Sequence, residues 1–128
     1  MIEIDPYCLN DKFAAHNNMT VTRIAPNYAE AQMVVSKQHL NSLGIPHGGV
    51  YFTLADLAFG AANNYTSCNM VTLNSSTEYI ASAKEGDTLT AYCSEVASSK
   101  KIRRYCTEIR NQDGKLLTVV QCAGYIKD

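Results

Sequence analysis

The sequence predicts an α+β fold in which a curved antiparallel β-sheet wraps around one long central helix at about residues 47–65. Between residues 50 and 62, ten of thirteen side chains are apolar. They occupy every face of the expected helix, which is typical of a helix buried on all sides. The C-terminal half holds runs rich in Thr, Val, Tyr and Ile, separated by short turns, as in consecutive antiparallel strands. The 128 residues show no linker or repeat, so we expect a single domain over 1–128.

The first third of the chain is expected to add a short helix and two strands. Asp5 and Pro6 can cap and open the helix, because proline is well accommodated in a first helical turn. A Pro26-Asn27 turn separates the two strands, the second of which alternates apolar and polar residues. The expected elements are a helix ending at about residue 16, strands at 19–24 and 29–35, and a loop at 38–46.

The rest of the chain is expected to supply the sheet around the long helix. Pro46 marks the entrance to that helix, and a polar loop follows it. The expected strands lie at about 70–80, 87–97, 102–110 and 116–126, with turns at 84–87 (KEGD), 98–101 (SSKK) and 111–114 (NQDG).

Composition excludes several classes of function. With 46% hydrophobic residues and a net charge of −1, the chain lacks the basic surplus that nucleic-acid binding requires. No apolar stretch reaches the length of a membrane span, and the N-terminal residues do not form a secretory signal. We therefore expect a soluble globular protein with neither nucleic acid nor membrane as a partner.

The five cysteines are dispersed, odd in number and never spaced as CxxC. Neither a disulfide framework nor a structural zinc site is expected from this pattern, and reduced thiols in a cytoplasmic protein fit it better. His16 and His39 have no metal-ligand spacing with His47, so we expect no metal and no cofactor.

Asp56 is a carboxylate near the centre of the apolar helix. Its neighbours three and four positions away include no basic residue, and the chain has no Lys or Arg between Lys37 and Lys84. Asp56 can lie at a boundary of the helix or pair with an arginine from a later strand. Otherwise it is an uncompensated carboxylate in a partly dry pocket, where desolvation raises its pKa and favours a role as base or nucleophile.

The residues His47, Gly48 and Gly49 stand at the expected helix start. The first amide N–H groups of a helix have no intrahelical partner, and the helix dipole is positive there. Glycine lets a ligand approach the backbone closely, so this site suits a carbonyl oxygen that gains negative charge. A glycine pair after a proline can also be a simple turn.

Gly48 and Asp56 are eight residues apart, about 12 Å along a helix axis. One carbonyl therefore cannot touch both groups of the same helix. If two subunits pack these helices antiparallel across a twofold axis, Gly48 of one meets Asp56 of the other. Joint action of both groups on one carbonyl thus implies a dimer with two composite sites.

The sequence resembles the hotdog-fold acyl-CoA thioesterases, specifically their phenylacetate-pathway (PaaI-like) branch. The resemblance is strongest over residues 41–83. It comprises Asn41 six residues before the HGG triplet, Asp56 nine residues after His47, an LAD-x-AFG helix and a strand that opens MVTLNSS. The resemblance implies hydrolysis of an acyl-CoA to a free acid and CoA by a homodimer. Relatives also form tetramers, and the sequence leaves dimer versus tetramer open.

The resemblance also implies roles for individual residues. The Gly48 N–H would polarise the thioester carbonyl, and Asp56 of the partner subunit would attack it or activate the attacking water. Asn41 would position the thioester or water, and His47 would shape the same pocket. Thr72 would hold the water or carboxylate, although Asn74 or Ser75 could take that role. The remaining expected substrate-binding residue is Gly49.

The chain departs from the family pattern at residues 80–83 (IASA), where many relatives carry a proline. The polar loop 63–69 gives no basis for borrowing the acyl preference of relatives. Basic side chains at strand ends can hold CoA phosphates or simply form a solvated surface: Lys84, Lys100, Lys101, Arg103 and Arg104. Arg103 and Arg104 should point to opposite faces of their strand.

Two other functions fit the same fold. The chain can be a non-catalytic domain that binds acyl-CoA as a sensor or carrier, a reading that the presence of both Asp56 and the HGG triplet disfavours. A hydratase or dehydratase is the third possibility, but the motifs of those enzymes are not found in this sequence.

Overall fold

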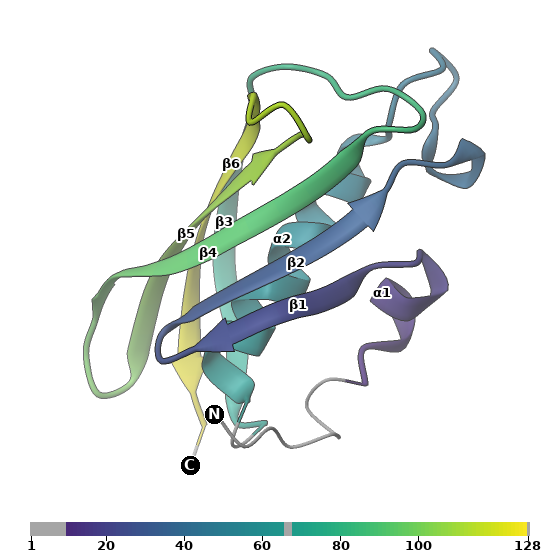
Figure 1. Ribbon diagram of the computed structural model, residues 1–128. Helices are drawn as coiled ribbons and strands as arrows, with labels where there is room; N and C mark the ends of the chain where they lie inside the picture. The colour runs from purple at the N-terminus through teal and green to yellow at the C-terminus, as the bar shows by residue number, and fades with distance from the viewer. Residues whose placement is uncertain (1–9, 66–67, 128) are drawn as a thin grey trace.

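Six antiparallel strands form one curved sheet, and helix α2 (Gly48–Asn64) lies across its concave face (Figure 1). The computed structural model describes residues 10–65 and 68–127. The strand order is β1-β2-β4-β5-β6-β3. The other elements are α1 (Lys12–His16), β1 (Thr20–Ala25), β2 (Tyr28–Val34), the 3-10 helix η2 (Lys37–His39), β3 (Met70–Tyr79), β4 (Thr88–Ser98), β5 (Ile102–Arg110) and β6 (Leu116–Ile126). The predicted α+β arrangement of a sheet wrapped around one long helix is confirmed.

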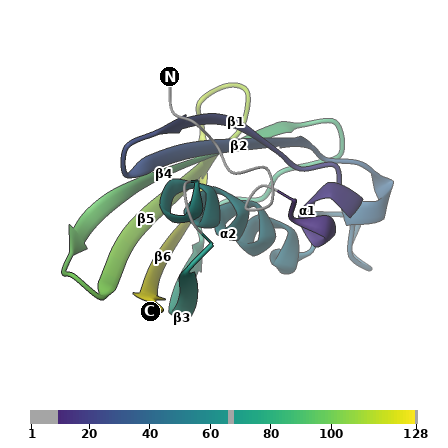
Figure 2. The same ribbon diagram turned by 90° about the horizontal axis from the view of Figure 1, so that it is seen from below.

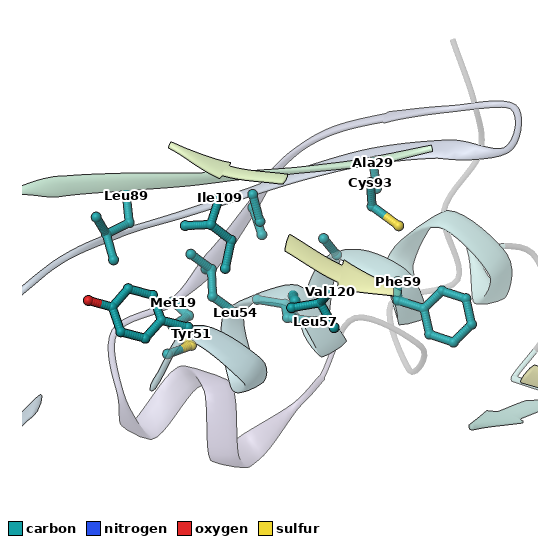
Figure 3. Packing of buried hydrophobic residues seen from close by; sticks show 14 of the residues in the cluster. Met19, Ala29, Tyr51, Leu54, Leu57, Phe59, Leu89, Cys93, Ile109 and Val120 are labelled. Atoms are coloured by element: carbon teal, nitrogen blue, oxygen red, sulfur yellow. The ribbon is translucent and has the colours of Figure 1, made fainter. Parts of the chain in front are cut away.

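The core lies between α2 and the concave face of the sheet. Seen from below, the strands curl around the helix axis (Figure 2). Leu54 and Phe59 of α2 are fully buried, and they share the core with Leu89 and Ile109 of the sheet (Figure 3). Full burial of side chains of this size contributes about 1.5–3 kcal/mol each, so helix and sheet stabilise one another.

The expectation that α2 is buried on every side is wrong within one chain. Eight of its side chains are buried, but a stripe at helical spacing is only half-buried or exposed. This open stripe consists of Gly49, Phe52, Thr53, Asp56 and Gly60. A sheet that curves around a helix covers one side of it, and apolar composition alone does not reveal which residues remain uncovered.

The start of helix α1 differs from the prediction. Asp11 caps it, with its Oδ1 accepting the Ala14 N–H at 3.0 Å, and the helix begins at Lys12. Asp5 and Pro6, the predicted cap, lie outside the described residues. Both Asp5 and Asp11 are chemically suited to an N-cap, so residue preference alone could not choose between them.

The outer strand β3 is exposed along most of its length. Val71 is 42% exposed, Leu73 is 56% exposed and Ile80, just past the strand, is 55% exposed. As an edge strand, β3 also presents unpaired backbone groups on its outer side. Monomeric proteins rarely leave an apolar edge of this kind uncovered.

The cysteines do not share one state. Cys93, Cys106 and Cys122 are free, whereas Cys68 is disulfide-bonded. The expectation of reduced thiols is therefore wrong at Cys68, and the inference from thiols to a cytoplasmic protein loses its support there. Spacing along the chain does not show which loops fold against each other. Among the described residues, no helix is both long enough and apolar enough to cross a membrane.

Candidate functional site

The start of α2 presents one free amide. His47 caps the helix, with its ring Nδ1 accepting the Gly49 N–H at 2.9 Å. Val50 N–H bonds the backbone carbonyl of His47 at 2.9 Å. Among the described residues, none accepts a hydrogen bond from the Gly48 N–H. The half-buried Gly48 thus offers a donor at the positive end of the helix dipole.

Asn41 organises the loop that leads into α2. Its Oδ1 accepts the backbone N–H groups of Leu43 at 2.9 Å and Ile45 at 3.4 Å. The backbone of Asn41 also bonds Ile45 O at 2.7 Å. These contacts identify Oδ1 as the acceptor atom, which leaves Nδ2 without a partner in the described part of the chain. Asn41 therefore has one amide donor to offer a ligand.

Asn41 and Gly48 line the same hollow, which has a volume of about 420 Å³. Most of its other walls are apolar or aromatic: Ile45, Pro46, Tyr51, Tyr79, Ile80 and Ala81, with Ser82 at one side. The structure thus brings together two of the predicted site residues. Two residues with an N–H group unpartnered in the described part of the chain thus border one largely apolar hollow.

His47 and Gly49 line a different hollow, of about 340 Å³, beside Phe13, Met19 and Thr53. Within one chain His47 and Asn41 therefore border different hollows, and the role of His47 in the thioester pocket stays a prediction. The reason is local. By turning back to cap the Gly49 N–H, the His47 ring takes up a position on the other side of the helix start.

Asp56 lies two turns further along α2, above the first residues of β3. Its Oδ1 is 3.5 Å from the hydroxyl Oγ1 of Thr72. Asn64 fixes this juxtaposition, because its Oδ1 accepts the Met70 N–H at 3.0 Å and its Nδ2 donates to Met70 O at 3.3 Å. The end of the helix thereby anchors the start of β3 and places Thr72 over Asp56.

A second hollow, of about 210 Å³, surrounds Asp56 and Thr72. Its other lining residues are Asp11, Leu57, Gly60, Ala61, Asn64 and Met70, and none of them is basic. Burial raises the pKa of the Asp56 carboxyl above its ordinary value, and the nearby charge of Asp11 raises it further. The hydrogen bond from Thr72 acts in the opposite direction and lowers this pKa. Asp56 is thus a carboxylate with no cationic partner and an enhanced tendency to take a proton.

Asn74 and Ser75 lie further along β3, and both are exposed. A register shift between Thr72 and Asn74 interrupts the regular alternation of side chains at this point. Of the three alternatives for holding the carboxylate or water, only Thr72 lies within 3.5 Å of Asp56 in the described residues.

The basic residues do not converge on either hollow. Arg103 lines a polar hollow with Asn27 and Asn63, and Arg104 lines a separate one with Ala97. The predicted opposite orientation of these two arginines agrees with their positions. Neither arginine lines the hollows of Gly48 or Asp56.

Two residues at the site carried no sequence signal. Asp11 faces Asp56 from a segment 45 positions earlier, and Tyr79 contacts Gly48 from the far end of β3. An aspartate in a helix cap and a tyrosine in a strand have ordinary structural uses, so neither stands out in the sequence.

The hollow at Gly48 and the hollow at Asp56 share no lining residue. One chain therefore presents two separate sets of functional groups: N–H donors at the helix start and a carboxylate with a hydroxyl in mid-helix. Among the described residues, no group of three His, Cys, Asp or Glu side chains could hold a metal ion.

Comparison with known proteins identifies relatives over most of the chain. The family model of the Thioesterase superfamily matches residues 43–118, which include Gly48, Asp56 and Thr72. A protein of Archaeoglobus fulgidus is 34% identical over 116 residues, or 91% of this chain and 75% of its own. The acyl-coenzyme A thioesterase PaaI of Escherichia coli is 31% identical over 110 residues, or 86% of this chain and 79% of its own.

Solved structures share the same architecture. The structure of E. coli PaaI superposes with a TM-score of 0.87 at 28% identity, over 93% of this chain and 86% of that chain. A hypothetical thioesterase protein of Streptococcus pneumoniae, solved with coenzyme A, has a TM-score of 0.79 at 26% identity, over 86% of each chain. That protein is also solved as an Asp-to-Ala and as a Thr-to-Ala mutant, at positions 16 residues apart.

Proposed function

Because the chain belongs to the thioesterase superfamily and is a thioester hydrolase with the hotdog fold, we propose that it cleaves an acyl-CoA to a free carboxylic acid and CoA. The observation that carries the proposal is Asp56, a partly buried carboxylate with a hydroxyl partner and no basic neighbour in its hollow. Two relatives support the substrate class, since one is named an acyl-CoA thioesterase and another is solved with CoA. Asp56 and Thr72 are 16 residues apart, the same separation as the two mutated positions in the S. pneumoniae protein.

The thioester carbonyl binds at the start of α2. The Gly48 N–H donates to the carbonyl oxygen, and the free Nδ2 of Asn41 donates from the side. As the carbonyl carbon becomes tetrahedral, its oxygen gains negative charge, which both donors and the helix dipole stabilise. The Gly49 N–H is already bonded to His47, so Gly49 contributes space for the ligand rather than a donor.

Asp56 brings about attack on the thioester carbonyl carbon by one of two routes. As a general base it removes a proton from water while the water oxygen attacks the carbonyl carbon. As a nucleophile its own oxygen attacks, giving a mixed anhydride that water then hydrolyses. In both routes the C–S bond breaks, CoA leaves as a thiolate that takes up a proton, and the acid is released. Thr72 orients the carboxylate or the water, while Asn74 and Ser75 remain predicted substrate-binding residues.

The two half-sites come together in a dimer. Gly48 and Asp56 lie on separate hollows of one chain, about 12 Å apart along the helix. Antiparallel packing of two α2 helices brings Gly48 of one protomer to Asp56 of its partner. The open stripe of α2 and the exposed apolar edge of β3 provide a surface for this packing.

The test of this function is release of CoA from a panel of acyl-CoAs, followed with a thiol-reactive dye. The wild-type chain should release CoA from at least one member of the panel. Asp56→Asn should lower the rate on the order of 100-fold or more, because the base or nucleophile is removed. Asp113→Asn, in the exposed β5–β6 turn, is the matched control and should retain the wild-type rate.

The stability of the same variant separates chemistry from unfolding. Since the folded state raises the pKa of Asp56, the charged carboxylate destabilises the fold at neutral pH. Asp56→Asn should therefore have a Tm at pH 7 that is no lower than that of the wild type. A wild-type rate in Asp56→Asn would refute the role of that residue. Tight CoA binding with no CoA release from any acyl-CoA would instead indicate a binding domain.

A further inference from the structure

Tyr79, the last residue of β3, bonds to the protein backbone through its hydroxyl although the side chain is largely exposed to solvent. Its hydroxyl donates to the backbone carbonyl of Gly48 at 3.1 Å, although the residue is 57% exposed. Water is available to an exposed phenol, so this contact is not needed to satisfy a buried polar group. The contact links the end of an edge strand to the start of α2.

The Gly48 carbonyl belongs to a peptide group that is held at both ends. Tyr79 bonds its oxygen, and the His47 ring bonds its N–H, which belongs to Gly49, at 2.9 Å. The next peptide group towards the N-terminus carries the unpartnered Gly48 N–H. Two consecutive glycines have the greatest backbone freedom of any residue pair, so in this first turn of α2 the two side-chain contacts add to the hydrogen bonds of the helix itself and restrict the orientation of the peptide further.

The Tyr79 ring is itself fixed against the helix start. A Cβ at Gly48 would lie 3.1 Å from the Tyr79 hydroxyl oxygen and 3.2 Å from ring atom Cζ. On its other side, the ring meets Tyr51 edge to face, with centroids 5.9 Å apart. The Tyr51 hydroxyl in turn accepts the Ala83 N–H at 3.0 Å, so both rings are anchored to the backbone.

We propose that Tyr79 is a positioning residue for the reaction: its hydroxyl clamps the Gly48–Gly49 peptide and so holds the Gly48 N–H in a fixed orientation beside the thioester carbonyl. The inference rests on the proposed function, in which the Gly48 N–H stabilises the developing oxyanion. A pre-oriented donor matters more to the charged transition state than to the neutral carbonyl of the substrate. Loss of the clamp should therefore appear in kcat rather than in KM.

Tyr79→Phe tests the proposal, because it removes the hydroxyl and keeps the ring. Its kcat should fall about tenfold, which is less than the loss expected on removing an oxyanion donor outright. KM should stay within about twofold and Tm within about 2 °C of the wild type, since an exposed hydrogen bond contributes little to folding. Tyr92→Phe, at another exposed strand tyrosine, is the matched control and should leave kcat unchanged.

A second measurement does not depend on substrate. With only seven glycines in the chain, ¹⁵N-glycine labelling gives a simple NMR spectrum in which the Gly48 and Gly49 amides can be followed. In Tyr79→Phe these two signals should shift or broaden and their amides exchange faster, while those of Gly86 and Gly114 stay in place. Unchanged Gly48 and Gly49 signals would overturn the clamp even if no substrate has been found.

The kinetic outcomes separate this inference from the function on which it rests. If Asp56→Asn is inactive but Tyr79→Phe keeps the wild-type kcat, the positioning role is wrong and the proposed function stands. A rise in KM with unchanged kcat would show that Tyr79 acts only as a wall of the substrate hollow and not as a clamp, which also overturns the proposal. If the wild type releases no CoA from any acyl-CoA, the proposed function fails, and the NMR result alone decides whether the clamp exists.

Discussion

Asp56 sits in a hollow that contains a second carboxylate, Asp11, and a single hydroxyl partner, Thr72. Burial and the charge of Asp11 both raise the pKa of Asp56, and the Thr72 hydrogen bond lowers it. A carboxylate with a raised pKa is a stronger base once ionised. The neighbours of Asp56 thus set both the pH at which its carboxyl loses a proton and its strength as a base.

The pH profile of kcat/KM should show the separate effects of Asp11 and Thr72 on the pKa of Asp56. In the proposed mechanism Asp56 must be deprotonated to act, so activity should rise with pH through its pKa, which is raised above its ordinary value. Asp11→Asn removes a negative charge and should move this rise to lower pH. Thr72→Val removes the hydrogen bond that favours the carboxylate and should move it to higher pH. The measurement is initial rates from about pH 3 to 9 for the three proteins.

Asp11→Asn is well matched because asparagine also caps helices, so the bond from the Ala14 N–H to the side chain at 11 can persist. Asp113→Asn, which removes a distant exposed charge, should leave the profile in place. Shifts of the two test variants in the same direction would contradict the electrostatic account. So would the absence of any shift.

At the level of single residues, the sequence identified those with an unusual context. Asp56 stood out because 46 consecutive residues around it contain no Lys or Arg, and Gly48 because two glycines follow a proline and a histidine. Asp11 and Tyr79 could not be identified in this way. Their importance comes from which segments the fold brings beside α2, and that information is spread over the whole chain.

The elements themselves were largely predictable. The observed bounds of β5 (Ile102–Arg110) and β6 (Leu116–Ile126) are those predicted, and α2 begins and ends within one residue of its expected limits. Strong local signals explain this agreement: polar turns with Ser, Lys, Asn, Asp and Gly bound the strands, and Pro46 precedes the helix. The cap of α1 and the open stripe of α2 depend on tertiary packing, so local pattern did not predict them.

Two connections of the sheet are joined by one buried carboxylate. Asp87, only 5% exposed, lies between β3 and β4, and its Oδ2 accepts the Lys84 N–H at 3.0 Å. Its Oδ1 accepts from Gln112 Nε2 at 2.9 Å, in the turn between β5 and β6. Gln112 is held in turn by the Thr88 N–H, which donates to its Oε1 at 3.0 Å. The hydrogen bond from Gln112 is the main cause that lowers the pKa of Asp87.

Asp87→Asn should therefore destabilise the fold by about 1–3 kcal/mol at pH 7. The amide nitrogen of asparagine would replace one of the two accepting oxygens, so either the Lys84 N–H or Gln112 Nε2 would lose its acceptor. A carboxyl whose pKa is lowered by folding contributes stability above its unfolded pKa, and that contribution is lost as pH falls through its folded pKa. The difference from the wild type should accordingly shrink towards about pH 3. Urea unfolding at several pH values measures it, with Asp113→Asn as the exposed control. A difference that does not vary with pH would exclude the ionised carboxylate as its cause.

In the proposed mechanism, the whole molecule has two half-sites that one chain cannot join. The helix that carries both Gly48 and Asp56 holds them at a fixed separation, about 12 Å, which no side-chain movement removes. Its open stripe also leaves Asp56 and Phe52 half-buried beside the exposed edge of β3. A second copy of the chain is the simplest partner that would cover this surface and complete both sites by one symmetric contact.

Mixing two inactive variants tests this arrangement. Asn41→Asp keeps an oxygen for the Leu43 and Ile45 N–H groups but loses the Nδ2 donor and places a negative charge beside the developing oxyanion. Asp56→Asn disables the other half-site. In composite sites, a dimer with one chain of each kind has one fully normal site and one doubly defective site. Random reassortment makes about half of the dimers mixed, so an equimolar mixture should regain about one quarter of wild-type activity.

Each variant carried through the same denaturation and refolding alone should stay inactive, and native mass spectrometry should count the mixed dimers. If both halves of a site came from one chain, every site in the mixture would still carry a defect and no activity would return. A wild-type protein that stays monomeric at assay concentrations and still cleaves thioesters at full rate would be equally decisive against the shared site. Recovery in proportion to the mixed dimer would locate the reaction between the two helices, because in the proposed dimer only that interface would bring Gly48 of one protomer to Asp56 of its partner.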